Sequence, residues 1–331
     1  MKKRILVTGG AGFIGSHFVS KLLHEHGDAY DICVVDCMTY AGDIQRLWLQ
    51  GVHTQIDFVH LNICAYQKLV NEINPPDYIV HFAAESHVDR SIHNSTAFVE
   101  SNVLGTQSIL DFARVSQTER VVLVSTDEVY GERLTGESYE EDPPKPRNPY
   151  SASKLGGEAL GMAYYHTYQT PVLITRGCNT FGKFQHPEKF IPKVITCALA
   201  DEPIPVYGNG LQEREWIEAG AHADAVYHIL MHGKLGETYN IGSGVRHTNI
   251  EMVKSILGIL RKPESLISYV ADRPGHDRRY AMNSGKLDML GWNDLNYICK
   301  SGGPLIQDVI RWYISDEGQK WSGRLAARMP R

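Results

Sequence analysis

The 331-residue sequence predicts an α/β protein in which a Rossmann-like, doubly wound parallel sheet is joined to a smaller C-terminal α/β domain. Three observations predict this fold. Short apolar runs alternate with helical stretches in the first half, a glycine-rich turn follows the first run, and the pattern becomes less regular after Phe181. We expect a first domain over residues 1–180, to which part of residues 212–243 returns, and a substrate-binding domain over residues 181–331.

Six short runs consist almost entirely of apolar residues, which is the pattern of parallel strands buried on both faces. These predicted strands cover residues 4–7, 32–35, 57–60, 78–82, 121–125 and 172–175. Helices are predicted over residues 15–26, 102–116 and 151–168. Because parallel strands need crossover connections, the helices should cover both faces of the sheet. Residues 132–148 are rich in Pro and Glu, and we interpret them as either a lid over a ligand or a solvated connection.

Composition excludes several classes of partner. The formal net charge is −5, with 33 Lys and Arg against 38 Asp and Glu and no long basic run, which argues against nucleic acid or an anionic membrane. No run of apolar residues is long enough to span a bilayer. The 6 cysteines are scattered without metal-ligand spacing, so we expect no metal and a location in the reducing cytoplasm.

A dinucleotide site is predicted where the first strand meets the first helix. Gly9, Gly12 and Gly15 leave a backbone without Cβ atoms, which can turn tightly and approach a pyrophosphate at the positive end of the helix. Asp36 ends the second strand about 20 residues further on, where a carboxylate accepts hydrogen bonds from the ribose of adenosine. Because this acid would repel the 2′-phosphate of NADP, we expect NAD.

The most specific chemical signal is the pair Tyr150 and Lys154, which lie four residues apart on one face of a predicted helix. A phenol is a poor base at neutral pH, but a nearby ammonium favours the phenolate and lowers its pKa. We expect Lys154 to lower the pKa of Tyr150 in this way. Thr126 and Asp127, at the end of a predicted strand, add a hydroxyl and a carboxyl to the same site.

With these residues in view, the chain resembles the extended short-chain dehydrogenases/reductases, and specifically the nucleotide-sugar 4,6-dehydratases. The resemblance runs over nearly the whole length. Besides the motifs above, it is carried by residues 81–90 (HFAAESHVDR), 125–131 (STDEVYG), 184–189 (FQHPEK) and 273–280 (RPGHDRRY).

The resemblance implies dehydration of a hexose linked to a nucleoside diphosphate, such as dTDP-glucose, to the 4-keto-6-deoxy sugar. Tyr150 and Thr126 would assist oxidation at C4, and Lys154 would also hold the nicotinamide ribose. Once C4 is a ketone, the C5 proton is acidic, so Glu128 is the expected base and Asp127 the expected acid for loss of water from C6. Two adjacent carboxylates raise one pKa, which helps to keep Asp127 protonated. The hydride then returns to C6, and NAD is expected to stay tightly bound.

The same resemblance implies the binding residues. NAD would contact the glycine turn, Asp36, Tyr150 and Lys154, together with Phe13, Ile14, Asn62, Ile63 and Ala83. The hexose would lie near Ser86, His87 and Asp89. The nucleotide diphosphate would be held by Asn179, Lys189, Arg214, Asn240, Arg273 and His276, among which the planar guanidinium groups suit phosphate. Glu188 would also bind the substrate.

Several positions depart from the family pattern and leave the base and the sugar open. The acid expected on the adenine side is Asn62, the pair after Asn179 is Thr180-Phe181, and Glu213 places an acid beside a phosphate ligand. Gly220-Ala221 replaces the Asp that would cap the helix beginning there, a loss of about 1 kcal/mol unless another residue substitutes. A specialised dehydratase acting on another nucleotide sugar is therefore an alternative.

Two further alternatives come from other classes. A 4-epimerase or decarboxylase of the same superfamily would use Tyr150, Lys154 and NAD without needing Asp127. A non-enzymatic NAD-binding scaffold is disfavoured, because such proteins tend to lose the Tyr or the Lys. We also expect a homodimer, since relatives pair the helices at 102–116 and 151–168 across a two-fold axis, and we expect Gly156 and Gly157 to mark close helix packing.

Overall fold

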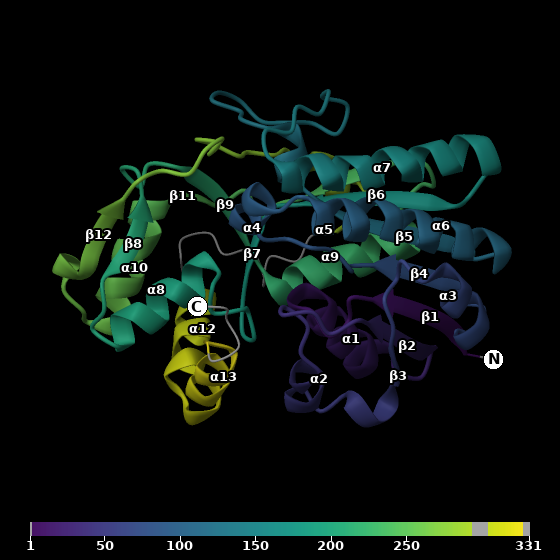
Figure 1. Cartoon of the computed structure of the whole chain (residues 1–331), viewed down its shortest axis with the longest axis horizontal. Coiled ribbons are helices and arrows are strands. Elements are labelled where there is room, and N and C mark those ends of the chain that lie inside the picture. The colour runs from purple at the N-terminus through teal and green to yellow at the C-terminus, as the bar shows by residue number, and fades with distance from the viewer. Residues whose placement is uncertain (1, 293–303, 327–331) are drawn as a thin grey trace.

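The computed structural model describes residues 2–292 and 304–326 (Figure 1). The first predicted domain begins at residue 1 and the second ends at residue 331. Both of these residues, and Cys299, lie outside the described part of the chain. Within the described part of the chain, the largest element is a seven-stranded sheet in which every pairing is parallel. The predicted parallel α/β fold is therefore confirmed.

The sheet has the strand order β10-β6-β5-β4-β1-β2-β3. Its strands are β1 (Lys3–Thr8), β2 (Tyr30–Asp36), β3 (Asp57–His60), β4 (Tyr78–His81), β5 (Arg120–Thr126), β6 (Val172–Gly177) and β10 (Thr238–Ile241). The order reverses beside β1, so the carboxyl ends of β1 and β4 flank a crevice of the kind that binds ligands in such sheets. Each of the six predicted strands coincides with one of these to within a few residues.

Helices cover both faces of the sheet, as predicted. On one face, α1 (Phe13–His26) packs against α9 (Ala219–His232); on the other, α6 (Thr106–Val115) packs against α7 (Pro149–Tyr168) and α3 (Tyr66–Glu72) (Figure 1). Side chains of β1 alternate between the two cores, with Ile5 and Val7 in one and Leu6 in the other. This alternation is expected of a strand that is buried on both sides.

The predicted helix over residues 102–116 begins earlier and contains a widened turn. α5 (Thr96–Val99) leads into a π-helical stretch, Glu100–Gly105, which continues into α6. The side chain of Asn102 in this stretch donates to the Ser153 hydroxyl of α7 at 2.9 Å and to the carbonyl of Glu85 at 3.0 Å. A π-bulge is an uncommon local distortion. The sequence did not predict it, because the pattern of apolar residues does not indicate where such a bulge occurs.

The second group of elements, on the left in Figure 1, has its own buried core, which includes Phe181, Ile195, Val253 and Trp321. Its sheets are formed by β7 (Asn179–Phe181), β9 (Glu213–Glu218) and β11 (Arg246–Thr248), and by β8 (Ile204–Tyr207) and β12 (Ile267–Val270). Its longer helices are α8 (Phe190–Leu199), α10 (Asn249–Leu260), α12 (Pro304–Ile314) and α13 (Asp316–Ala326). β10 and α9, which lie in the second half of the sequence, pack with the large sheet, but the division at residue 180 stays a prediction.

The shorter elements connect these layers. They are α2 (Gln45–Leu49), η1 (His53–Gln55), α4 (Val88–His93), η3 (Asp127–Tyr130), η4 (Glu264–Leu266) and α11 (Gly285–Met289). Residues 132–148 contain no helix or strand, but they are tied down, because Ser138 donates to the carbonyl of Ala281 and accepts from the amide of Asn283, both at 2.9 Å. No helix in the described residues is both long and apolar enough to cross a membrane.

Candidate active site

The glycine turn after β1 forms the floor of a cavity, which we call the central cavity. Gly9 has φ +70°, and a Cβ atom there would lie 2.5 Å from the backbone nitrogen of Ala83. A Cβ at Gly15 would collide with the carbonyl oxygen of Gly9. Gly12 precedes α1 and no side chain caps this helix, so the amides of its first turn remain available to an anion.

A second cavity, the Asp36 cavity, adjoins the first and shares Gly9 and Gly12 with it. The Asp36 carboxylate accepts hydrogen bonds from the amides of Ala11 at 3.0 Å and Met38 at 2.8 Å. Burial raises its pKa, while these two hydrogen bonds act in the opposite direction. Asn62, Ile63 and Ala83 line the same cavity. A cradle without Cβ atoms, beside a carboxylate at the end of β2, fits the pyrophosphate and adenosine ribose of NAD.

The five predicted catalytic residues all line the central cavity, which has a volume of about 270 Å³. They are Thr126, Asp127, Glu128, Tyr150 and Lys154. They come together because β5 ends at Thr126, η3 carries the two carboxyl groups, and α7 begins at Pro149. Asn148 joins these elements: its side chain caps α7 by accepting from the amide of Ser151 at 2.8 Å and donates to the Glu128 carboxylate at 3.1 Å.

Asp127 is buried, with 3% of its surface exposed, and its two carboxyl oxygens differ in their hydrogen bonding. The Thr126 hydroxyl donates to its Oδ1 at 3.2 Å, whereas Oδ2 has no hydrogen-bond partner within the described residues. Burial raises the pKa of Asp127 well above its ordinary value, and the charge of Glu128 adds to this effect. The predicted direction is therefore found, and a protonated Asp127 is suited to donate a proton.

Tyr150 and Lys154 stand as predicted on the first turns of α7, but the predicted effect on the phenol is wrong. Burial, and next the charge of Glu128, raise the pKa of Tyr150 above its ordinary value, while a hydrogen bond with Thr126 acts in the opposite direction. The reason is that desolvation of the phenolate dominates, and that the Lys154 ammonium is held at the carbonyl of Val124, 2.7 Å away. Burial lowers the pKa of Lys154 to about 8.

The third cavity, the Arg273 cavity, has a volume of about 390 Å³ and shares Ser86, Glu128 and Asn179 with the central cavity. Nine of the predicted substrate-binding residues line it: Ser86, His87, Asp89, Asn179, Glu188, Lys189, Arg214, Arg273 and His276. They come from distant parts of the sequence, and the fold brings them together in one cavity. The sequence motifs alone did not show that they would be neighbours. The central cavity shares lining residues with each of the other two, and we call the three adjoining cavities, from Asp36 to Arg273, the cleft.

Asp89 connects two walls of the Arg273 cavity. Its carboxylate accepts from the Tyr207 hydroxyl at 3.1 Å and pairs with the Arg273 guanidinium at 3.3 Å. The Nε atom of Arg273 is buried and has no hydrogen-bond partner in the described part of the chain. An unpartnered guanidinium N–H in a cavity favours an anionic ligand such as phosphate.

Asn240 is the predicted substrate-binding residue that the structure places elsewhere. It is fully buried and lines none of the three cavities. Its Oδ1 accepts from the Tyr130 hydroxyl at 2.8 Å, and its Nδ2 donates to the carbonyls of Ser138 and Asn283. With both ends of the amide satisfied by the protein, Asn240 fixes residue 138 to β10 and does not reach a substrate.

Two of the sequence departures have local explanations. Glu213 does not face a phosphate site, because its carboxylate pairs with the Arg279 guanidinium at 2.8 Å. The missing helix cap before His222 is replaced by Glu218, whose carboxylate accepts from the amides of Gly220 at 2.6 Å and Ala221 at 3.3 Å. Glu218 therefore supplies the stabilisation that a capping Asp would give.

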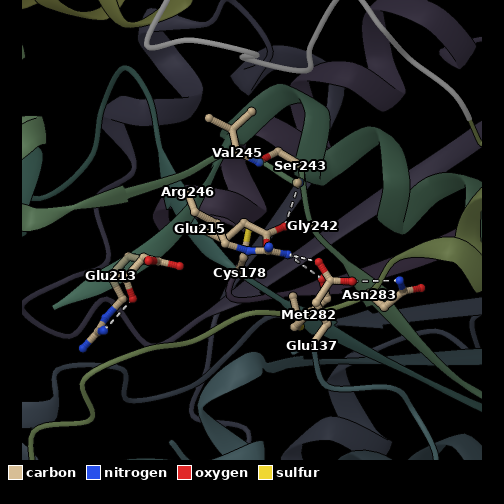
Figure 2. Close-up of polar contacts among 12 residues, drawn as sticks. Glu137, Cys178, Glu213, Glu215, Gly242, Ser243, Val245, Arg246, Met282 and Asn283 are labelled. Atoms are coloured by element: carbon tan, nitrogen blue, oxygen red, sulfur yellow. Dashed lines mark hydrogen bonds and ion pairs between the residues drawn. The ribbon is translucent and has the colours of Figure 1, made fainter. Parts of the chain in front are cut away.

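A charge network around the buried Glu215 connects β9, β11 and Glu137 (Figure 2). Arg246 lies between two carboxylates, 3.1 Å from Glu215 and 2.6 Å from Glu137. Glu137 in turn accepts from the Asn283 side chain at 2.9 Å, and Glu215 accepts from the amide of Gly244 at 2.9 Å. The network thus fixes residues 132–148 to β9 and β11. Arg214 lies on β9, next to Glu215.

Sequence reasoning missed several residues of the cleft. Arg46 and His222 line the central cavity, and the Tyr280 hydroxyl donates to Asp277 at 2.7 Å and lies 3.5 Å from the Glu128 carboxylate. Tyr280 lies within a motif that the resemblance had singled out, so its place beside Glu128 had a signal. Arg46 had no such signal, because the three backbone carbonyls to which it donates, those of Ala11, Ala41 and Phe184, are brought together around it by the tertiary fold.

A dinucleotide-type glycine turn, a Tyr and a Lys on one helical face, and a separate cavity for an anionic ligand define an extended short-chain dehydrogenase/reductase. The chain belongs to the GDP-mannose 4,6 dehydratase family, whose model matches residues 6–297.

Three individual proteins show what this chain is similar to within that family and fold. The low-salt glycan biosynthesis protein Agl12 of Haloferax volcanii is 47% identical over 313 residues, which are 95% of this chain and 99% of that protein. A dTDP-glucose 4,6-dehydratase of Xanthomonas campestris pv. campestris (strain B100) is 43% identical, covering 94% of this chain and 93% of its own. The crystal structure of DesIV (dTDP-glucose 4,6-dehydratase) from Streptomyces venezuelae, with NAD and TYD bound, has a TM-score of 0.93 at 42% identity, covering 97% and 99%.

Proposed function

We propose that this chain catalyses the NAD-dependent dehydration of a nucleoside diphosphate hexose, with dTDP-glucose as the first candidate, to the 4-keto-6-deoxy sugar. The observation that carries this proposal is the pairing of a buried Asp127, whose pKa is raised, with Glu128 in the cavity that also contains Tyr150 and Lys154. An acid beside a base is what an elimination of water requires, in addition to the Tyr and Lys of a dehydrogenase. The 4,6-dehydratase relatives support the same reaction.

In the first step, Tyr150 takes the proton of the C4 hydroxyl, with the Thr126 hydroxyl as its hydrogen-bonding neighbour. When bound, NAD accepts the hydride from C4, and the positive charge of its ring favours the phenolate. Lys154 adds a second positive charge and reaches the nicotinamide ribose from α7. These charges oppose the burial that raises the pKa of Tyr150 in the protein by itself.

In the second step, Glu128 removes the proton from C5, which the C4 ketone has made acidic. The Oδ2 of Asp127, which has no hydrogen-bond partner in the described residues, gives a proton to the C6 hydroxyl, so this group leaves as water. Asn148 holds the Glu128 carboxylate in place by donating to its Oε2 at 3.1 Å, and the Tyr280 hydroxyl lies 3.5 Å from the same oxygen. Hydride return to C6 and a proton at C5 complete the product.

The Arg273 cavity holds the nucleotide diphosphate in this proposal. Arg214 and Arg273 supply two guanidinium groups for a pyrophosphate, and Tyr207 supplies an aromatic face beside them for the base. Ser86 and Lys189 line both this cavity and the central cavity, where a hexose would lie, and His87 lines the Arg273 cavity beside them. NAD occupies the Asp36 cavity and the adjoining glycine turn.

A panel of nucleotide sugars tests the reaction. Each sugar is incubated with the protein and the product is weighed by mass spectrometry. We expect one of them to lose the mass of one water molecule. A product of unchanged mass would favour a 4-epimerase and loss of carbon dioxide a decarboxylase, and either result would overturn the proposed dehydration. Conversion of a sugar other than dTDP-glucose would identify a specialised dehydratase.

We also propose that the protein is a homodimer, paired through the faces of α6 and α7 that point away from the sheet. Exposed apolar residues support this arrangement: Val99, Leu104, Val115 and Tyr168 are each about half exposed on these helices and the segment that precedes them. Light scattering at micromolar concentration should give the mass of two chains. The mass of one chain would contradict it.

The cytoplasm is the proposed location. The five described cysteines are all free thiols, which suits a reducing compartment. Fractionation of cells that produce the protein should recover it with cytoplasmic markers, and recovery with secreted or membrane fractions would overturn this location.

A further inference from the structure

His222 is a buried residue of the central cavity that the proposed reaction does not use. It lies in the first turn of α9 and is 2% exposed, and its ring lines the same cavity as Tyr150 and Lys154. The ring lies against the end of β6, where a Cβ at Gly177 would be 2.7 Å from Nε2 and would collide with Cε1. Only a glycine at position 177 leaves room for this ring.

The hydrogen bonds of Thr180 fix which nitrogen of His222 carries the proton. The Thr180 hydroxyl donates its single hydrogen to the carbonyl of Cys178 at 3.2 Å. The same oxygen is 2.8 Å from Nδ1 of His222, and both contacts can be hydrogen bonds at once only if this nitrogen is the donor. Burial lowers the pKa of His222 to about 4, so the ring is neutral at physiological pH. Nδ1 is protonated, and Nε2 is left with a free lone pair.

This lone pair has no hydrogen-bond partner in the described part of the chain. A buried acceptor without a donor is costly, and such groups are usually satisfied by a ligand or by water. Cys178 and Thr180, which line the cavity beside His222, do not supply a donor to Nε2. The missing donor is therefore expected from whatever fills the central cavity.

The position of His222 indicates which part of a dinucleotide it meets. Asp36 and Asn62 line the cavity at the adenosine end, whereas His222 lies with Tyr150 and Lys154 in the central cavity, which also contains the glycine turn. The pyrophosphate would lie at the glycine turn and the reacting ring toward Tyr150, where Lys154, on α7 at the opposite face of the sheet, would take the ribose hydroxyls. The remaining strong donor of oxidised nicotinamide riboside is the amino group of its carboxamide.

We propose that His222 positions the nicotinamide ring by accepting a hydrogen bond at Nε2 from the carboxamide amino group. The inference rests on the proposed function only in taking the central cavity to hold NAD. Thr180 acts through His222, because it fixes the tautomer that leaves Nε2 free to accept. His222 is thus a cofactor-positioning residue that distinguishes a carboxamide from a group without an N–H donor.

Competition between NAD and its 3-acetylpyridine analogue tests this role, because the analogue replaces the amino group with a methyl and keeps the carbonyl. Holoprotein equilibrated with labelled NAD is challenged with unlabelled NAD or with the analogue, and the ratio of the two dissociation constants is measured. The same ratio is measured for His222→Gln, whose amide oxygen can replace Nε2 as acceptor, and for His222→Met, which has similar length and no comparable acceptor. Thermal melting of each variant shows that it is folded.

We expect the wild type and His222→Gln to prefer NAD over the analogue, and His222→Met to lose about five- to tenfold of this preference, the value of one buried hydrogen bond. If His222→Met weakens NAD and the analogue equally, His222 only supports the fold and the inference is overturned while the proposed function stands. If the wild type does not bind NAD at all, the proposed function fails and this inference fails with it.

Discussion

The guanidinium of Arg246 and the carboxylate of Glu215 form an ion pair of 3.1 Å in which the Glu215 side chain is only 1% exposed. A buried charge that loses its partner is far more costly than a surface charge, because water cannot replace the lost contact. Arg246→Met should therefore lower the free energy of unfolding by about 3–5 kcal/mol, which urea denaturation can measure.

A surface pair supplies the control for this prediction. Lys254 and Glu264 are 2.8 Å apart, but their side chains are 49% and 61% exposed. Lys254→Ala should leave the free energy of unfolding nearly unchanged, because water and salt screen an exposed pair. If Arg246→Met costs no more than Lys254→Ala, the network of Figure 2 does not stabilise the fold.

Two helical glycines should respond in opposite ways to substitution by alanine. A Cβ at Gly157 would lie 2.7 Å from the carbonyl oxygen of Asn102, a backbone atom that cannot move aside easily, whereas a Cβ at Gly258 in α10 would meet nothing within 4 Å. Gly258→Ala should stabilise the protein by about 0.5–1 kcal/mol through helix propensity, and Gly157→Ala should destabilise it. Equal melting temperatures for the two variants would show that α7 does not pack as closely as described.

Asp127→Asn should separate the two halves of the proposed reaction. Without its proton donor the protein can still oxidise C4, so reduced nicotinamide and the 4-keto sugar should accumulate while release of water slows by about 10²- to 10⁴-fold. Tyr150→Phe should block the oxidation itself, so no reduced nicotinamide should appear. The absorbance of the nicotinamide in a single turnover distinguishes the two. Accumulation of reduced nicotinamide in Tyr150→Phe would contradict its role as the first base.

Stability should fall in acid partly because of His81. This residue is buried, and its ring nitrogens lie 2.7 Å from the Thr8 hydroxyl and 3.1 Å from the Thr106 hydroxyl. Burial lowers the pKa of His81 from 6.5 to about 3. Above pH 6.5 neither the folded nor the unfolded form binds the proton; as the pH falls below 6.5 towards 3, only the unfolded form does, so stability is lost by up to about 1.4 kcal/mol per pH unit.

The variant His81→Gln isolates this contribution. It should be less stable at neutral pH, because the ring contacts are lost, but its stability should decline less steeply between pH 6.5 and the acid unfolding transition. Urea denaturation at a series of pH values gives both slopes. Identical slopes for the two proteins would mean that the His81 ring is protonated in the folded state as well.

Much of the sheet was predictable because each strand is a short apolar run that can be recognised in the sequence by itself. Apolar runs such as Ile5–Val7 are buried on both faces, and the glycine turn marks where the first strand meets its helix. The proposed catalytic residues could be picked out for the same reason, since Thr126 to Glu128 and Tyr150 to Lys154 are local motifs, each within one short stretch of sequence.

The remaining features depend on contacts between distant residues. The wide turn at Asn102, the enclosure of Asn240 by Ser138 and Asn283, and the replacement of a helix cap by Glu218 arise only when separate elements meet. The direction of the pKa of Tyr150 was missed because the pairing of Tyr and Lys on one helix says nothing about how deeply the phenol is buried. Desolvation is a property of the folded site.

The transfer of deuterium within the sugar tests the central claim most directly. dTDP-glucose labelled with deuterium at C4 is incubated with the protein in ordinary water, and the product is analysed by mass spectrometry and NMR. If the hydride is taken from C4 and returned to C6 within one active site, the 4-keto-6-deoxy product carries the deuterium in its C6 methyl group. A product that retains the C6 hydroxyl, with deuterium still at C4, would contradict the account.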